Sequence, residues 1–247
     1  MEIIGIIPAR YASTRFPGKP LADIHGKSMI RRVYDQCVKA DLDRIIVATD
    51  DTRIYEHVKN FGGEVVMTSK EHQSGTDRIA EAAIALKIKS DAIVINIQGD
   101  EPFINPNDIK SLGNCFRTKE TQIATLVKKI KELDVLLNPN SPKVVIGMSN
   151  QAIYFSREAI PHQRNQPKEK WLAHQNYYQH IGIYAFKCSI LKKVSLLKTS
   201  PLEVSEGLEQ LRWIENNYTI NTVETSSESI AVDNPEDLRR IDEKFFS

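Results

Sequence analysis

A cationic turn near the N-terminus is the first part of this sequence with the residue types for chemistry. It follows the apolar segment 3–7 and carries Arg10, Arg15 and Lys19, with no acidic residue before Asp23. Its small residues and a Pro-Gly pair let the backbone present amide N–H groups to an anion, while the three cations supply charge to a polyphosphate. The turn matches neither GxGxxG nor GxxxxGKS/T, which disfavours a dinucleotide fingerprint and a Walker loop. A polyphosphate site is predicted, against the alternative of an ordinary loop with solvated basic side chains.

Two aspartates that are distant in the sequence are candidate metal ligands. Asp100 follows the apolar segment 92–97, and Asp233 follows the apolar segment 230–232, which we expect to be a short strand. Mg²⁺ takes oxygen ligands, typically one or two carboxylates together with substrate phosphates and water. The alternative for Asp100 is a turn aspartate. For Asp233 it is a helix N-cap, although Asn234 already holds that position before a proline.

Other polar residues give weaker signals. The segment 68–77 contains a Ser-Gly-Thr sequence between a predicted strand and a predicted helix, where glycine lets a nucleobase approach the backbone. A plain helix-entry turn is the alternative. His57 and His72 are expected at the surface. His180 lies inside the apolar run 178–186, where a core histidine and a ligand contact are equally compatible with the pattern.

The elements that position these residues alternate between two periodicities. Short β-branched runs alternate with amphipathic stretches, which is typical of βαβ units that feed a parallel sheet. Ligands of such sheets bind beyond the carboxyl ends of the strands, where both candidate sites fall. We therefore predict a Rossmann-like α/β fold, with a mainly parallel sheet and helices on both faces. The expected strands of the first half are 3–7, 45–48, 65–67 and 92–97, with helices after residues 49–51 and from Asn105.

The second half of the chain is expected to contain mixed strands because the alternation loosens after residue 122. We expect strands at 122–127 and 178–186 and a hairpin of 143–148 with 151–156. The polar segment 161–175 has no period and predicts an exposed loop without a role in the core. Two helices are expected, over 202–216 despite Gly207, and from Asn234 with Leu238, Ile241 and Phe245 on one face.

Composition excludes several classes of protein. The chain has 247 residues, of which 41% are hydrophobic and 26% are charged, and its net charge is +1. Such a chain has no global field for nucleic acid or an anionic membrane. No apolar run is long enough for a membrane span, and no signal peptide is expected, so we predict a cytoplasmic protein with one domain over 1–247. Three isolated cysteines are expected to be reduced packing residues, namely Cys37, Cys115 and Cys188.

The segment 6–21 closely resembles the opening of the 3-deoxy-manno-octulosonate cytidylyltransferase family, also called CMP-Kdo synthetases. Eight further segments resemble blocks of that family in the same order: 47–51, 61–65, 74–78, 98–102, 154–157, 180–184, 208–212 and 232–237. The resemblance implies the nucleotide-diphospho-sugar transferase fold and the transfer of CMP from CTP to 3-deoxy-manno-octulosonate (Kdo). Pyrophosphate is released, and the activated sugar serves the inner core of lipopolysaccharide. It also implies Mg²⁺ as cofactor and a homodimer.

The resemblance also implies a role for each site residue. Catalysis would involve Arg10, Lys19 and Asp100, with Asp100 and Asp233 as the Mg²⁺ ligands. The nucleotide would contact Pro8, Ala9, Arg10, Arg15, Lys19, Ser74, Gly75, Arg78 and Gln98. The sugar would contact Gln98, Arg157, His180, Tyr184, Glu209 and Gln210. Arg157 is the expected partner of the Kdo carboxylate because a planar guanidinium pairs with a carboxylate in bidentate fashion. No general base is evident, so we expect metal coordination to lower the pKa of the attacking hydroxyl.

Several alternatives stay open. Some relatives act on the 8-amino analogue of Kdo, and no residue identified here decides between a hydroxyl and an amine. Sialic acid cytidylyltransferases and sugar-1-phosphate uridylyltransferases share the expected fold and metal chemistry, but their first loops differ in pattern. A metal-dependent glycosyltransferase is disfavoured because Asp100-Glu101-Pro102 lacks the Asp-X-Asp spacing. A nucleotide-sensing module without turnover is the alternative outside the enzymes. The sequence departs from the family pattern at Ser28, at 147–150 and at Gly207, of which only the last is close to predicted sugar contacts.

Overall fold

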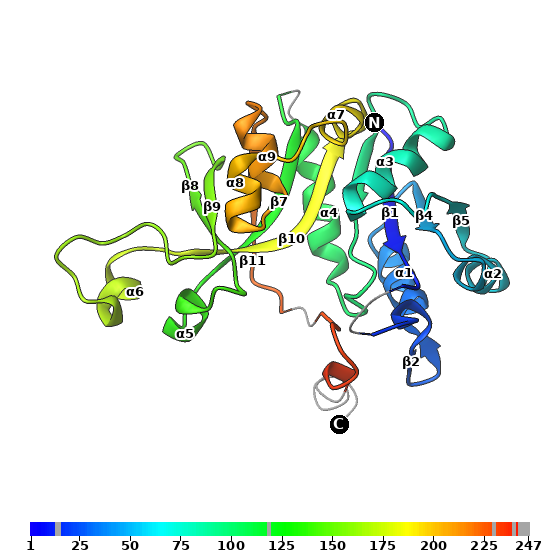
Figure 1. The fold of residues 1–247 in the computed structure, drawn as a ribbon, viewed down its shortest axis with the longest axis horizontal. Coiled ribbons are helices and arrows are strands. Elements are labelled where there is room, and N and C mark those ends of the chain that lie inside the picture. Colours follow the sequence, from blue (N-terminus) through cyan, green and yellow to red (C-terminus); the bar gives the residue numbers. More distant parts are fainter. Residues whose placement is uncertain (13–15, 118–119, 229–230, 239–240, 242–247) are drawn as a thin grey trace.

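A nine-stranded sheet runs through the computed structural model, which describes residues 1–12, 16–117, 120–228, 231–238 and 241 (Figure 1). The strand order is β11-β7-β10-β6-β1-β4-β5, with β8 beside β10 and β9 beside β8. The strands are β1 Ile3–Ala9, β4 Arg44–Thr49, β5 Glu64–Met67, β6 Ile93–Asn96, β7 Ile123–Lys129, β8 Lys143–Ile146, β9 Ala152–Ser156, β10 Tyr178–Lys187 and β11 Ile220–Thr225. A separate hairpin pairs β2 Asp23–Ile24 with β3 Lys27–Ser28.

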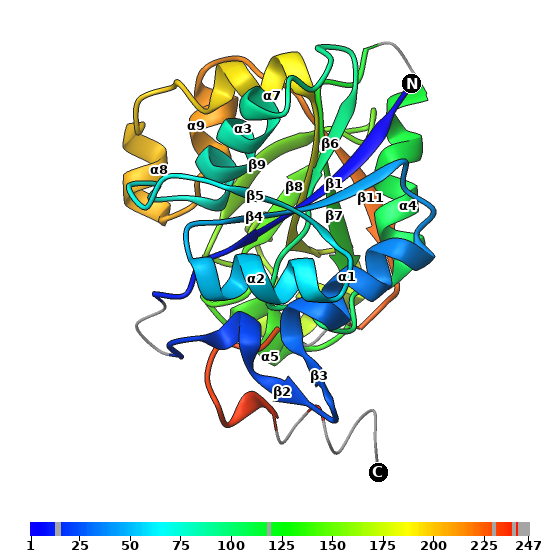
Figure 2. The same cartoon turned by 90° about the vertical axis from the view of Figure 1, so that its right-hand side faces the viewer.

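Helices cover both faces of this sheet, as predicted (Figure 2). The α-helices are α1 Met29–Lys39, α2 Thr52–Asn60, α3 Gly75–Ala85, α4 Pro106–Asn114, α5 Leu133–Leu137, α6 Trp171–His174, α7 Cys188–Val194, α8 Pro201–Glu206 and α9 Gln210–Glu215. Short 3₁₀ turns are η1 Lys19–Leu21, η2 Cys115–Arg117 and η3 Lys168–Lys170.

The first half of the chain forms the parallel part of the sheet. β1 lies between β4 and β6 and is parallel to both, and β5 is parallel to β4. Capping signals set the helix boundaries as the sequence predicted. The Asp51 side chain accepts the Arg53 N–H at the start of α2, Gly62 follows the helix with φ 79°, and Asn105 caps α4. All four strands predicted in this half are confirmed.

The second half is mixed, which confirms the prediction. β10 is antiparallel to both β6 and β7, and β11 is parallel to β7. The β8–β9 hairpin turns through Asn150, whose φ is 56°. The β10–β7 ladder shifts register between Ile181 and Tyr184, which marks a bulge in β10. Strand β11 has no counterpart among the predicted elements.

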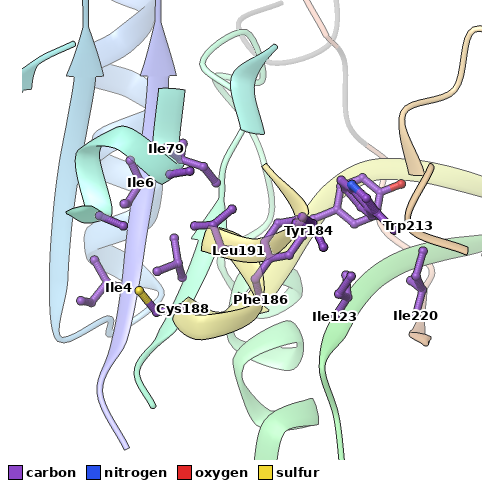
Figure 3. Packing of buried hydrophobic residues seen from close by; sticks show 14 of the residues in the cluster. Ile4, Ile6, Ile79, Ile123, Tyr184, Phe186, Cys188, Leu191, Trp213 and Ile220 are labelled. Atoms are coloured by element: carbon purple, nitrogen blue, oxygen red, sulfur yellow. The ribbon is translucent and has the colours of Figure 1, made fainter. Parts of the chain in front are cut away.

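Two hydrophobic cores pack against opposite faces of the sheet. One core lies between α1, α2 and α4 and the sheet, and it includes Ile7 and Ile95. The other lies under α3, α7 and α9, where Phe186 packs edge to face against Trp213 at 5.2 Å between ring centroids (Figure 3). Residues that alternate along β6 therefore enter different cores, which explains why Ile93, Val94 and Ile95 are all apolar.

The prediction of an exposed loop without a core role at 161–175 is wrong for the last part of this segment. Its last part forms η3 and α6, and the Trp171 side chain is 2% exposed. Trp171 stacks on Tyr177 at 6.0 Å and packs with Ile130 and Leu136 in a small core of its own. One aromatic residue in a polar segment creates no hydrophobic period, so the pattern gave no sign of this packing.

The prediction of one continuous helix over 202–216 is also wrong. It is divided into α8 and α9 because Gly207 takes the left-handed conformation, with φ 59°, and closes α8. This is the usual role of glycine at a helix C-terminus. The break places Glu209 directly before α9.

The C-terminal segment differs in part from expectation. Val232 and Asp233 are not in a strand, because Val232 makes a single backbone bond to the carbonyl of Asp100, at 2.9 Å, and extends no ladder. Ile230 and Phe245 lie outside the described residues. Asn234 caps the following turn, with its side chain accepting the Asp237 N–H at 3.1 Å.

Two cysteines confirm the prediction of packing residues, because Cys37 and Cys188 are buried, whereas Cys115 is half-buried. None of the three forms a disulfide. Within the described ranges, no helix has both the length and the apolar character that a membrane crossing requires.

Candidate functional site

A cavity of about 280 Å³ lies at the carboxyl edge of the parallel strands. It brings together residues from four separate parts of the sequence. The predicted site residues that line it are Pro8, Ala9, Arg10, Lys19, Ser74, Gly75, Arg78, Gln98, Asp100 and Asp233. Arg15 lies outside the described residues. The cationic turn, the Ser-Gly-Thr segment and both aspartates therefore share one cavity.

The end of β1 and the loop after β6 approach each other closely where they line this cavity. A Cβ atom on Gly99 would lie 2.8 Å from the carbonyl oxygen of Pro8, so only glycine fits without a backbone shift. This approach places Asp100 beside the cationic turn that follows β1. Arg10 is exposed at the cavity wall, and among the described residues it has no ion-pair partner, which leaves its charge available to an anionic ligand.

Lys19 links the two distant aspartates. Its Nζ atom donates to Asp100 Oδ2 at 2.7 Å and to the carbonyl of Val232 at 2.8 Å, and it lies 3.8 Å from Asp233 Oδ1. The bond from the Val232 N–H to the Asp100 carbonyl holds the C-terminal segment against this loop. The Lys19 side chain is 15% exposed, so the ion pairs form in a partly desolvated place where they are stronger than at an open surface.

The two carboxylates suit Mg²⁺ better than a metal with a full set of protein ligands. Within the described part of the chain, no three His, Cys, Asp or Glu side chains gather in a metal-binding cluster. Asp100 and Asp233 both face the Lys19 ammonium, which shows that this position attracts a cation. Their side chains are 28% and 45% exposed, so other ligands have access. Mg²⁺ commonly takes one or two carboxylates and completes its shell with phosphate oxygens and water.

The N-terminus of α3 forms another wall of the cavity. Ser74 caps this helix by accepting the Asp77 N–H at 3.1 Å, and Gly75 begins it. Helix N-termini present unpaired N–H groups and partial positive charge to a ligand. Arg78 is only 3% exposed, and its guanidinium donates to Asp50 Oδ2 at 2.7 Å and to Thr68 Oγ1 at 2.6 Å. Arg78 therefore borders the cavity mainly as a residue that holds a loop.

A second cavity, of about 600 Å³, lies beyond Gln98. Gln98 lines the first cavity and donates from Nε2 to the carbonyl of Gly182 at 2.7 Å, and Gly182 lines the second. The second cavity is bordered by β10 near its bulge and includes His180 and Leu208. A ligand that spans both cavities would meet the Gln98 side chain at their boundary.

His180 and Tyr184 are buried beside this second region. Burial lowers the pKa of His180 to about 3, so the imidazole is neutral at physiological pH. It forms a 3.2 Å hydrogen bond with Thr125 Oγ1. Burial, together with the negative charge of Glu209, raises the pKa of Tyr184 well above its ordinary value, so the phenol stays protonated. Both side chains are neutral polar groups, which are suited to hydroxyl recognition.

The start of α9 adds two further predicted sugar residues. Glu209 accepts a hydrogen bond from Thr76 Oγ1 at 2.8 Å and thereby joins α9 to the start of α3. Burial raises its pKa above the ordinary value of a glutamate. Gln210 is 4% exposed, and among the described residues its Nε2 has no hydrogen-bond partner. A buried donor without a partner is unfavourable, and a ligand oxygen would satisfy it.

Arg157 makes contacts of a different kind, and its pairing with a sugar carboxylate stays a prediction. Its guanidinium donates to three backbone carbonyls: Glu206 at 2.7 Å, Pro139 at 3.0 Å and Gly207 at 3.2 Å. It lines neither cavity, which is equally true of Tyr184, Glu209 and Gln210. The residue joins the end of β9 to the junction of α8 and α9, and its planar fork serves main-chain oxygens.

Three polar residues at or beside the site were not among those predicted from the sequence, namely His72, Gln73 and Asn96. His72 and Gln73 line the first cavity, although His72 was expected at the surface. His57, also expected there, is half-buried and hydrogen-bonded to Ser28 Oγ at 2.7 Å. Asn96 is 3% exposed in β6, and its Oδ1 has no hydrogen-bond partner among the described residues. A polar residue within an otherwise apolar strand was the signal that could have identified Asn96.

A cationic loop, a helix N-terminus and two carboxylates at the carboxyl edge of a mainly parallel sheet define a nucleotide-binding α/β protein. A family model described as Cytidylyltransferase matches residues 4–226, so the chain is a member of the cytidylyltransferases.

The relatives give a narrower family. A protein of Parabacteroides distasonis named 3-deoxy-manno-octulosonate cytidylyltransferase is 54% identical over 97% of this chain and 96% of its own length. One of Bacteroides thetaiotaomicron with the same name is 52% identical over 98% of both chains. The solved structure of CMP:2-keto-3-deoxy-manno-octonic acid synthetase complexed with CTP has a TM-score of 0.89 and 39% identity, with 98% of this chain and 97% of that chain covered. This chain therefore belongs to the 3-deoxy-manno-octulosonate cytidylyltransferase family.

Proposed function

We propose that this protein transfers CMP from CTP to the 2-hydroxyl of Kdo, with Mg²⁺ as cofactor and release of pyrophosphate. We further propose that it works in the cytoplasm as a homodimer and supplies the activated sugar for lipopolysaccharide synthesis. The carrying observation is the convergence of Lys19, Asp100 and Asp233 on one cavity, next to the N-terminus of α3. Membership of the family supports the choice of nucleotide and sugar.

On the nucleotide side, the chain's own residues bind and orient a triphosphate. Arg10 and Lys19 balance the charge of the phosphates, and the backbone around Pro8 and Gly75 accommodates the nucleoside. Asp100 and Asp233 would hold Mg²⁺, which supplies electrostatic stabilisation of the charge on the phosphates when bound. In-line attack on the α-phosphorus needs little covalent help, so positioning and charge balance provide most of the acceleration.

On the sugar side, the buried polar groups match a ligand with many hydroxyls. The Nε2 of Gln210 and the Oδ1 of Asn96 are a donor and an acceptor without partners among the described residues. Neutral His180 and protonated Tyr184 add two groups that each exchange hydrogen bonds with a hydroxyl. A sugar seated beside Gln98 would place its anomeric hydroxyl at the boundary with the nucleotide cavity.

A pyrophosphate-release assay with the purified protein tests this function. CTP and UTP would each be offered with Kdo, 8-amino-Kdo, sialic acid or a sugar 1-phosphate. We expect turnover with CTP and Kdo, its loss in EDTA and its recovery with added Mg²⁺. Turnover with 8-amino-Kdo alone would change the acceptor, and CTP binding without turnover would indicate a nucleotide-sensing module. Sedimentation of the same preparation tests the homodimer.

A further inference from the structure

The loop between β5 and α3, residues 68–74, lacks regular secondary structure but is anchored at several points. It supplies His72, Gln73 and Ser74 to the nucleotide cavity. A loop that contributes to a binding wall must be held in one conformation before the ligand arrives, because otherwise binding includes the free energy of ordering it. The Thr68 N–H also donates to the carbonyl of Thr49 in β4, at 2.8 Å, and the side chains that hold the rest of the loop come from α3.

Arg78 anchors the beginning of the loop. Its Nη1 atom donates to Thr68 Oγ1 at 2.6 Å and to the carbonyl of Ser69 at 3.3 Å. Its Nη2 atom donates to Asp50 Oδ2 at 2.7 Å, so the guanidinium is itself held from the other side. The side chain is 4% exposed, and the ion pair with Asp50 is largely shielded from water.

Glu81 lies one helical turn after Arg78 and anchors the middle of the loop. Its Oε2 atom accepts the backbone N–H of Ser69 at 2.9 Å and also pairs with Nε2 of His72. Because a carboxylate only accepts hydrogen bonds, the His72 nitrogen that faces it carries the proton. Burial acts to raise the pKa of Glu81, but the bonds from Ser69 and His72 outweigh it and the net shift is downward. The carboxylate is therefore charged at neutral pH.

We propose that Glu81 is a positioning residue for the nucleoside end of CTP, because it holds His72 and the backbone of residues 68–74 in the shape that receives the base. Glu81 contacts Ser69 and His72 and, among the described residues, makes no hydrogen bond to Lys19 or Asp100, although His72 lines the same cavity as these two residues. The proposal rests on the proposed function in that CTP is the nucleotide, but it does not depend on the sugar.

Direct binding measurements test the proposal on two ligands. Calorimetry in the presence of Mg²⁺ would compare CTP, which has a base, with pyrophosphate, which has none. We expect Glu81→Ala to weaken CTP binding by about tenfold, a loss on the scale of one or two hydrogen bonds, and to leave pyrophosphate binding within about twofold of wild type. In turnover assays the same variant should raise KM for CTP by a similar factor with little change in kcat.

Three further variants make the test specific. Glu81→Gln keeps an oxygen acceptor for Ser69 and His72, so it should restore CTP binding to within about threefold of wild type. His72→Phe removes only the ring donor on a loop and should reproduce part of the loss without unfolding the protein. Glu71→Ala alters an exposed carboxylate in the same loop and keeps the backbone carbonyl that accepts from Gln73 Nε2. Among the described residues, the Glu71 carboxylate makes no hydrogen bond or ion pair, so this variant should change nothing.

The outcomes separate this proposal from the proposed function. Equal weakening of CTP and pyrophosphate by Glu81→Ala, or unchanged CTP binding in both Glu81→Ala and His72→Phe, would overturn the positioning role. A wild-type protein that binds no CTP would instead overturn the proposed function. If Glu81→Ala lowers the melting temperature strongly, His72→Phe and Glu81→Gln still decide the question.

Discussion

The nucleotide side and the sugar side of this site are built differently. On the nucleotide side, Arg10, Ser74 and Asp100 occupy loops that follow β1, β5 and β6, and parallel strands deliver such loops to one edge of the sheet by topology alone. On the sugar side, His180 lies before a bulge in β10 and Gln210 begins a helix that follows a break. Positions on the first side follow from strand order, whereas positions on the second depend on how particular side chains pack.

The largest effect is expected from Asp100→Ala, on the nucleotide side. Loss of this carboxylate removes a proposed Mg²⁺ ligand and the partner of Lys19, so kcat should fall by about 10³-fold, the scale of a lost preorganised electrostatic contact. Steady-state kinetics with CTP and Kdo measures the change. Asp91→Ala is the matched control, because Asp91 is an exposed aspartate just before β6, at the opposite edge of the sheet. This variant should keep the wild-type turnover rate and fold normally. A near-normal rate for Asp100→Ala would remove the metal assignment.

The next effect concerns the pH dependence of stability, on the sugar side. The unfolded chain protonates His180 near its ordinary pKa of 6.5, whereas the folded protein does not protonate it until about pH 3. Between these values the unfolded state binds one more proton, so this residue makes the fold less stable as pH falls, by up to about 1.4 kcal/mol per pH unit. Urea unfolding at pH 4.5, 5.5 and 6.5 measures the slope.

His180→Phe is the matched variant for this measurement, because a phenyl ring preserves the edge-to-face contact with Phe155, at 5.0 Å, and has no proton to bind. Its unfolding free energy should depend less steeply on pH across the same window. Identical slopes for the two proteins would mean that His180 is accessible to protons in the folded state, and the sugar side would then be more open than the structure indicates.

Arg157 distinguishes the two accounts of the sugar side. Arg157→Leu keeps the apolar stem but removes the donors to Pro139, Glu206 and Gly207, and we expect it to lower the free energy of unfolding by about 1–3 kcal/mol. Chemical denaturation measures this, with the exposed Arg164→Leu as control. Unchanged stability combined with a large rise in KM for Kdo would restore the carboxylate pairing that the resemblance implies.

How much the sequence could predict follows the same division. The four parallel strands, the cap at Asp51 and the convergence of Lys19, Asp100 and Asp233 were all accessible, because local signals and topology fix them. The hydrogen bonds from Arg157 to backbone carbonyls could not be predicted, because an arginine looks the same in the sequence whether it binds a ligand or a carbonyl. Burial of Trp171 and the role of His72 depend on contacts between distant segments, for which no local pattern exists.

The smallest effect is expected at the break that precedes α9. Gly207 has φ 59°, where a side chain introduces strain, so Gly207→Ala should lower the free energy of unfolding by about 1 kcal/mol. An added Cβ would lie 3.7 Å from Arg157 Nη2, an ordinary contact, so backbone strain and not a clash sets this value. Gly147→Ala is the control, because Gly147 lacks a positive φ and its nearest neighbour would be 3.5 Å away. Since Glu209 and Gln210 follow the break directly, the strained variant should also raise KM for Kdo more than KM for CTP. Equal changes in both would show that the two sides of the site are coupled through the Glu209–Thr76 bond more tightly than their separate construction indicates.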